Sequence, residues 1–372
     1  MIFKKGELFN GPGGLSLGAK KAKVVAPNGE VYTIQHQWSN DFDINACKTY
    51  GLNICGDEDH PSVHYGPVER LPIGERNKLG DIDCFVFGFP CNDYSNVGEK
   101  KGLNGTFGPL YSYGVKVLKE YKPKFFVAEN VGGLQSANEG KAFIQILKEL
   151  MQPSGDVEYE VIPHLYKFEE YGIPQARHRI IIVGIRKDLA DKGIVYRVPA
   201  PTTPNSADYR TSSDAILNPA IPDDAPNHEK TTHRQNVVDM LNHIPPGENA
   251  WYIGIPEELQ LNVRGARLSS IYKRLDPNKP AYTVTGSGGG GTHMYHWEEP
   301  RALTNRERAR LQTFPDDFVF VGSKEAVRKQ VGMAVPPEGA KIVFEAILKS
   351  FAGIEYNYVE PTAKLQISRL LV

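Results

Sequence analysis

Short apolar runs recur along the first half of the chain and alternate with helical patterns. Residues 84–89, 124–128 and 180–185 are nearly continuous apolar runs, as in strands buried on both faces of a parallel sheet. Residues 111–121 have a helical pattern, and residues 143–151 place Phe143, Ile146, Leu147, Leu150 and Met151 on one helical face. This alternation predicts an α/β fold with a doubly wound, mostly parallel sheet.

Further local signals predict a hairpin and two helices. Residues 24–34 form the hairpin, with Asn28-Gly29 at its turn. Thr304 and Glu307 form a capping box that opens a helix running to about Thr313, and residues 337–351 form a last amphipathic helix.

The periodicity lapses over residues 187–280, which are rich in proline, and we therefore place a domain boundary near Lys187. The predicted domains are a catalytic domain at 1–187 plus 331–372 and a smaller, irregular domain at 188–330.

Composition is that of a soluble globular protein, with 372 residues, 40% hydrophobic and 23% charged. No apolar run approaches the ~18 residues that span a bilayer, and no signal peptide opens the chain, so we expect a cytoplasmic protein without membrane contact. Its four cysteines lack CxxC spacing, which predicts neither a metal site nor disulfides. With a net charge of −1, binding to nucleic acid would require local basic patches.

Cys91 is the candidate nucleophile. The apolar run at 84–89 ends at Pro90, and polar residues follow Cys91, including Ser95. The carboxyl end of a buried strand is where open α/β sheets place their chemistry. A lone cysteine is more often structural, but that interpretation suits Cys84, which lies inside the run, better than Cys91.

A glycine-rich turn at 9–14 follows the first strand and precedes a predicted helix, so its backbone can approach a ligand closely. It is not a GxGxxG dinucleotide motif, because Ser16 replaces the third glycine. Asp41 follows at a spacing suited to ribose hydroxyls. Alternatively, Asp41 or Asp43 caps the helix that begins near Ile44, and both roles are compatible.

Two more groups are candidates for the same sheet edge. Glu129 follows the strand at 124–128, where the alternative is a solvated carboxylate. Arg177 and Arg179 alternate on an extended segment, which predicts that they point the same way, and the alternative is a basic strand edge that blocks aggregation.

A basic run between residues 264 and 279 predicts a DNA-facing surface. Arg264, Arg267 and Arg274 are our candidates, because Gly265 and Ser269-Ser270 lie beside them and let the backbone approach a groove. The alternative is that one or more of them face solvent or pair with acids.

Taken in order, these segments resemble the DNA cytosine-5 methyltransferase family. The resemblance rests on FNGPGG (9–14), SNDFD (39–43), GFPCNDYS (88–95), ENV (129–131), QARHR (175–179), RALTNRERARLQTFPDDF (301–318) and QVGMAVPP (330–337). It implies a Rossmann-like catalytic domain, a target-recognition domain, S-adenosylmethionine as cofactor and base flipping from double-stranded DNA. It also implies a monomer. Whether a cognate restriction endonuclease is encoded nearby is a question that the neighbouring genes would answer.

The family's motifs assign roles to residues of this chain. The implied catalytic residues are Cys91, Glu129, Arg177 and Arg179. The implied cofactor-binding residues are Phe9, Asn10, Gly11, Gly13, Gly14, Asp41, Phe42, Pro90 and Leu110. The implied DNA-binding residues are Ser95 and Gln175, beside the three arginines of the basic run.

The chain departs from the family pattern at three places: Pro67, where an acid usually meets the cofactor's adenine, Asn92, where glutamine is usual, and Met333, where asparagine is usual. Two other functions stay open. A tRNA methyltransferase of the same family usually has a smaller recognition region, and a nicotinamide-dependent dehydrogenase would not explain the Pro-Cys, Glu-Asn-Val and QARHR segments together.

Overall fold

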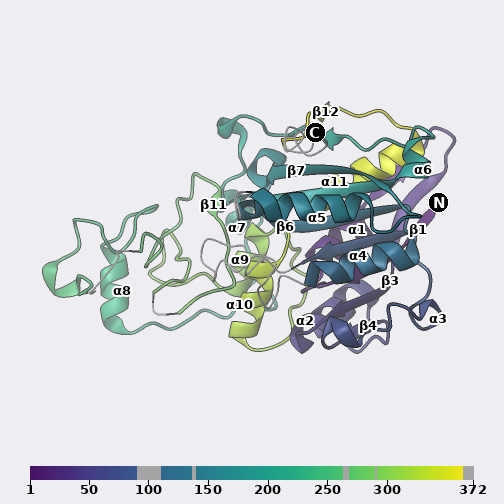
Figure 1. Cartoon of the computed structure of the whole chain (residues 1–372). Coiled ribbons are helices and arrows are strands. Elements are labelled where there is room, and N and C mark those ends of the chain that lie inside the picture. The colour runs from purple at the N-terminus through teal and green to yellow at the C-terminus, as the bar shows by residue number, and fades with distance from the viewer. Residues whose placement is uncertain (90–109, 136–139, 263–267, 290, 363–372) are drawn as a thin grey trace. The chain divides into compact units, whose positions relative to one another are not determined.

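The computed structural model describes residues 1–89, 110–135, 140–262, 268–289 and 291–362. The chain divides into two compact units (Figure 1). Unit 1 comprises Met1–Lys167, His178–Pro201 and Pro337–Val372, and unit 2 comprises Phe168–Arg177 and Thr202–Pro336.

Unit 1 is built on an eight-stranded sheet in the order β2-β3-β1-β5-β6-β9-β7, with β4 also pairing with β3. Its strands are β1 (Ile2–Leu8), β2 (Lys23–Val25), β3 (Val31–Asp41), β4 (Val63–Tyr65), β5 (Cys84–Gly88), β6 (Phe125–Val131), β7 (Tyr159–Lys167) and β9 (His178–Arg186). The strands β4, β3, β1, β5 and β6 pair in parallel, whereas β2, β9 and β7 pair antiparallel. The predicted mostly parallel sheet and the hairpin at Asn28-Gly29 are confirmed.

Helices cover both faces of this sheet, as the doubly wound prediction requires. They are α1 (Gly14–Lys21), α2 (Ile44–Tyr50), α3 (Arg76–Leu79), α4 (Tyr111–Tyr121), α5 (Lys141–Met151), α6 (Lys187–Ala190) and α11 (Pro337–Ala352). Phe126 belongs to the core cluster that α4 and α5 complete. The ring of its neighbour Phe125 packs against Phe351 of α11, with the two ring centroids 5.6 Å apart. Successive strand residues point to opposite faces, so one apolar run fills both layers.

Within its described residues, unit 1 also contains three short helices, η1 (Gly51–Cys55), η2 (Val68–Arg70) and η5 (Gly132–Gln135). A two-stranded sheet of β10 (Val198–Pro199) and β12 (Tyr358–Val359) completes it.

Unit 2 is mostly irregular, as the lapse of periodicity predicts (Figure 1). Its elements are β8 (Gln175–Ala176), β11 (Ala281–Tyr282), α7 (Ser212–Leu217), α8 (Gln235–Asn242), α9 (Asn305–Leu311), α10 (Lys324–Met333) and the short helices η7 (Phe168–Tyr171), η8 (Ser206–Asp208) and η9 (Glu257–Leu259). A small core around Leu241, Ile244 and Tyr295 holds it together. The capping box of Thr304 and Glu307 opens α9 as predicted.

The two compact units differ in extent from the predicted domains at three segments. Residues 188–201 belong to unit 1, where β10 pairs with β12. Residues 168–177 belong to unit 2, where β8 pairs with β11, although we expected them in the catalytic domain. Residues 331–336 also belong to unit 2.

Candidate active site

The glycine turn after β1 is tied to the end of β3 by Asp41. Gly11 N donates to Asp41 Oδ2 at 2.8 Å. The turn passes through left-handed backbone at Gly11 (φ 50°) and Gly13 (φ 97°), which only glycine adopts readily. A Cβ at Gly13 would also lie 3.0 Å from Tyr50 Cδ2, so the turn packs directly on α2.

Asp41 does not cap α2. Asp43 does, because its Oδ1 accepts from Asn45 N at 3.0 Å. Asp41 Oδ1 instead accepts from Asp43 N at 2.9 Å. Burial raises the pKa of Asp41 to about 6, against the lowering effect of these backbone donors. Asp43 therefore has the capping role, and the ribose-binding role of Asp41 stays a prediction.

The groups around this turn fit a nucleoside ligand. Asn10 is buried, and its Oδ1 has no hydrogen-bond partner among the described residues, so the turn offers an unused acceptor. Phe9 adopts a left-handed backbone (φ 56°), and Phe42, beside Asp41, is 61% exposed although it is a large apolar ring. Gly14 is the first residue of α1, and Leu110 precedes α4 and packs against the core of unit 1.

The carboxyl ends of β5 and β6 meet at the neighbouring sheet edge. Gly88, the last residue of β5, pairs with Glu129 of β6. A Cβ at Gly88 would lie 3.3 Å from Glu129 Oε2, so the glycine leaves room for the carboxylate. Cys91 follows three positions after Gly88 in the sequence, and Pro90, Cys91 and Ser95 lie outside the described residues.

Glu129 is paired with one of the two predicted arginines. Arg179 Nε lies 3.0 Å from Glu129 Oε1, and both side chains are 14% exposed. Arg179 belongs to β9, the antiparallel neighbour of β6. The structure thus brings Glu129 and Arg179 together beside the strand that leads to Cys91.

Arg177 and Gln175 both belong to unit 2. Arg177 is almost fully buried in unit 2, and its guanidinium donates to Val284 O at 2.9 Å and Gly332 O at 3.0 Å. Gln175 is fully buried and binds Leu311 O and Val284 N. β8 ends at Ala176 and β9 begins at His178, so Arg177 lies between the two strands, where backbone carbonyls hold its guanidinium, whereas Arg179 of β9 pairs with Glu129. The catalytic role of Arg177 stays a prediction.

Arg274 is likewise a structural residue. It is 5% exposed and donates to His296 O at 2.8 Å, Leu241 O at 2.8 Å and Ile244 O at 2.9 Å. This placement does not support a DNA-facing role. Arg264 and Arg267, the other two candidates, lie outside the described residues.

The sequence analysis missed two supports of the site. Asn130 Nδ2 donates to Phe89 O at 3.0 Å and so holds the residue that follows β5, two positions before Cys91. Below the glycine turn, the buried Lys5 ammonium donates to Glu7 and Ser16, and Tyr50 OH donates to Glu7 Oε2 at 3.0 Å. Two charged residues on a buried first strand were the available signal for this network.

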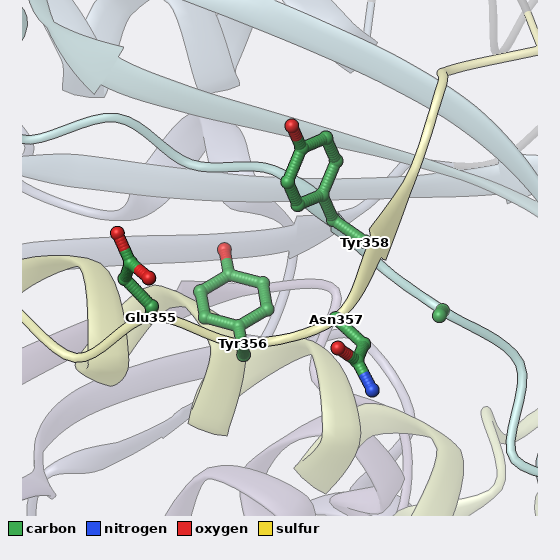
Figure 2. Close-up of a pocket in the computed structure, with 5 residues that line it drawn as sticks. Glu355, Tyr356, Asn357 and Tyr358 are labelled. Atoms are coloured by element: carbon green, nitrogen blue, oxygen red, sulfur yellow. The ribbon is translucent and has the colours of Figure 1, made fainter.

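One surface pocket of unit 1 lies away from these residues. It is lined by Ala200, Glu355, Tyr356, Asn357 and Tyr358, where β12 and its neighbours meet β10 (Figure 2). Ala200 N donates to Asn357 O at 2.9 Å there, so the pocket is a by-product of this small sheet. Within the described ranges, no helix is both long and apolar enough to cross a membrane.

Comparison with known proteins covers nearly the whole chain. The model of the C-5 cytosine-specific DNA methylase family matches residues 3–349. The chain is 64% identical to the type II methyltransferase M.BbvI of Brevibacillus brevis over 96% of this chain and 93% of that protein. It is 40% identical to the type II methyltransferase M.NgoFVII of Neisseria gonorrhoeae over 96% of this chain and 89% of that protein.

Solved structures agree on the fold. A prophage-encoded protein of E. coli, assigned as a DNA modification methyltransferase, superimposes with a TM-score of 0.65 at 23% identity, covering 94% of this chain and 99% of that one. The S. pombe Dnmt2 methyltransferase gives a TM-score of 0.54 at 13% identity over the same shares. With the family model and these relatives in agreement, the chain belongs to the C-5 cytosine-specific DNA methylase family and is a DNA cytosine-5 methyltransferase.

Proposed function

We propose that this protein methylates C5 of a cytosine flipped out of a specific duplex DNA sequence, through a covalent bond between Cys91 and C6. The observation that supports this most is the ion pair of Arg179 and Glu129 beside Gly88, three positions before Cys91 in the sequence. A carboxyl group and a guanidinium at that edge match the polar groups of a cytosine ring.

The cofactor in this proposal is S-adenosylmethionine, which offers an electrophilic methyl group when it is bound. Phe9, Asn10, Gly11, Gly13 and Gly14 would cradle it, with Asp41 accepting hydrogen bonds from the ribose hydroxyls. The unused Asn10 oxygen and the exposed Phe42 ring favour this assignment. Pro90 and Leu110 complete the proposed set.

The reaction begins at the thiolate of Cys91. Cytosine C5 is a poor nucleophile until the thiolate adds to C6 and converts C4, C5 and C6 into an enamine. Glu129 would donate a proton to N3 and, as carboxylate, hold the exocyclic amine, and Arg179 would stabilise charge at O2. After methyl transfer, loss of the C5 proton and departure of the Cys91 sulfur restore the aromatic ring.

The target base has to leave the duplex for this chemistry, at a cost of a few kcal/mol. We assign choice of the DNA sequence to unit 2, because the catalytic groups of unit 1 contact only the target cytosine in this mechanism. The type II names of the relatives favour a role beside a restriction endonuclease.

Trapping on DNA that carries 5-fluorocytosine tests the adduct directly. Fluorine at C5 cannot be lost as a proton, so turnover stops with Cys91 bound to C6. We expect a denaturation-resistant complex with the wild-type protein and with Cys47→Ala, a control at a buried thiol of α2, but none with Cys91→Ala. A complex of equal yield with Cys91→Ala contradicts the mechanism. Methyl incorporation into tRNA but not into duplex DNA would favour the tRNA enzyme instead.

A further inference from the structure

Three potential metal ligands converge in unit 1, and none of them is among the predicted site residues. His36 of β3, Cys55 at the end of η1 and His60 before β4 each offer one ligand atom, and these atoms lie within 4.8 Å of one another. All three residues are half-buried, so an ion from solvent can reach them. The sequence predicted no metal, because the ligands are separated by 19 and 5 positions and show no CxxC pair.

We propose that His36, Cys55 and His60 form a binding site for a single Zn²⁺ ion. One thiolate and two imidazoles are ligands that zinc favours, and three protein ligands leave a fourth position for water. Tetrahedral coordination with bonds of about 2.0–2.3 Å places ligand atoms roughly 3.3–3.6 Å apart, so the cluster needs to contract by only about 1 Å. This proposal does not rest on the reaction mechanism proposed above.

The surroundings of the cluster resemble a metal site's outer sphere. His36 Nδ1 lies 3.0 Å from Tyr50 OH, a contact of the kind that orients a ligating imidazole. The other nitrogen, Nε2, lies 2.7 Å from Ser62 Oγ, which is also 2.8 Å from His60 Nδ1. The hydroxyl of Ser62 therefore joins the two rings in the metal-free protein and would have to yield one of these contacts to the ion.

Protonation of the cluster is compatible with a metal. Burial, together with the nearby Lys5 ammonium, lowers the pKa of His36 to about 3, so its imidazole is neutral at physiological pH. Burial raises the pKa of Cys55 to about 11, so zinc would displace the thiol proton on binding. Two cations, Lys5 and Lys20, lie near the Cys55 thiol. Lys5 is already paired with the buried Glu7, and Lys20 donates to the backbone carbonyls of Asn53 and Ile54.

The test is a titration of the reduced, metal-free, full-length protein with Co²⁺ and then Zn²⁺. We expect one ion per chain, a near-ultraviolet thiolate-to-cobalt band, and bleaching of that band by Zn²⁺. Cys55→Ser should remove the band, and His60→Gln should weaken binding by more than the roughly 10–100-fold typical of an outer-sphere loss. Tyr50→Phe keeps the ring but removes the hydroxyl, so we expect its loss of metal affinity to lie within that 10–100-fold range.

Cys47→Ser is the matched control, because Cys47 is a buried thiol of α2 outside the cluster. This variant should keep both the band and the affinity. Zn²⁺ should raise the melting temperature of the wild type and Cys47→Ser but not of Cys55→Ser, as ligand binding to the folded state requires. Absence of a thiolate band in the wild type, or equal affinity of the wild type, Cys55→Ser and His60→Gln, would overturn the proposal.

Discussion

Arg179 Nε lies 3.0 Å from Glu129 Oε1, so the proposed acid and the proposed charge stabiliser are partners before DNA arrives. Only 14% of each side chain is exposed, which reduces solvent screening of the pair. The pair holds the carboxylate at the edge where β5 ends.

Replacing either partner should slow methyl transfer. We expect Glu129→Gln and Arg179→Ala each to lower turnover by about 10²-fold, the usual scale of a general-acid contribution. Because the two groups are in contact, the double variant should be little slower than either single one. Single-turnover assays on duplex DNA measure this, and fully additive losses would show that the two side chains act independently.

Asp41 and Asp43 should differ in what their loss affects. Asp41→Ala removes the proposed ribose acceptor and should weaken S-adenosylmethionine binding by about 1–3 kcal/mol. Asp43→Ala removes the cap of α2 and should cost about 1 kcal/mol of folding free energy while cofactor affinity stays near wild type. Calorimetry and denaturant titration of both variants separate the roles, and the idea fails if Asp41→Ala binds the cofactor normally.

Cofactor binding should depend on pH through Asp41. Its pKa of about 6 in the free protein lies above that of an unfolded chain, so ionisation on raising the pH works against folding. The stabilisation by the protonated form is complete below about pH 4 and is lost as the pH rises through about 6. Ribose hydroxyls would favour the ionised form, so affinity should increase between about pH 5 and 7. Affinity that stays constant over this range in calorimetry contradicts the assignment.

Met333→Asn should be tolerated despite the family's preference for asparagine. Met333 is the last residue of α10 and is 61% exposed, so the thioether contributes little buried area. We expect a stability change within about 0.5 kcal/mol and unchanged turnover. A large loss of activity at unchanged melting temperature would reveal a contact that depends on the thioether.

The arginines of the basic run should fall into two classes. Arg274→Ala removes the guanidinium that donates to three buried carbonyls and should cost at least about 2 kcal/mol of stability. At Arg264 or Arg267, loss of a base contact should relax the recognised site at one base pair, and loss of a phosphate contact should weaken binding to all sequences with a shallower salt slope.

Mapping methylated cytosines for each variant, beside binding at two salt concentrations, distinguishes these outcomes. Unchanged sites and salt slopes in both Arg264→Ala and Arg267→Ala would place the reading surface elsewhere in unit 2. A wild-type melting temperature for Arg274→Ala would contradict its structural role.

Local patterns determined the elements of this protein. Apolar runs predicted β5, β6 and β9, periodicity predicted α4, α5 and α11, and Thr304 with Glu307 predicted the start of α9. Each of these signals involves residues within a few positions of one another, so the sequence contains it directly. The ordered motifs likewise indicated the family, which the family model confirms.

Tertiary structure alone decided which polar residues are available for chemistry. Arg177 and Arg179 are two positions apart, yet Arg177 is held by carbonyls 107 and 155 positions away while Arg179 pairs with Glu129. The same long-range folding buried Arg274 and gathered His36, Cys55 and His60. A buried charge needs partners, and those partners were backbone groups and side chains that only the fold brings near, so no local pattern could reveal them.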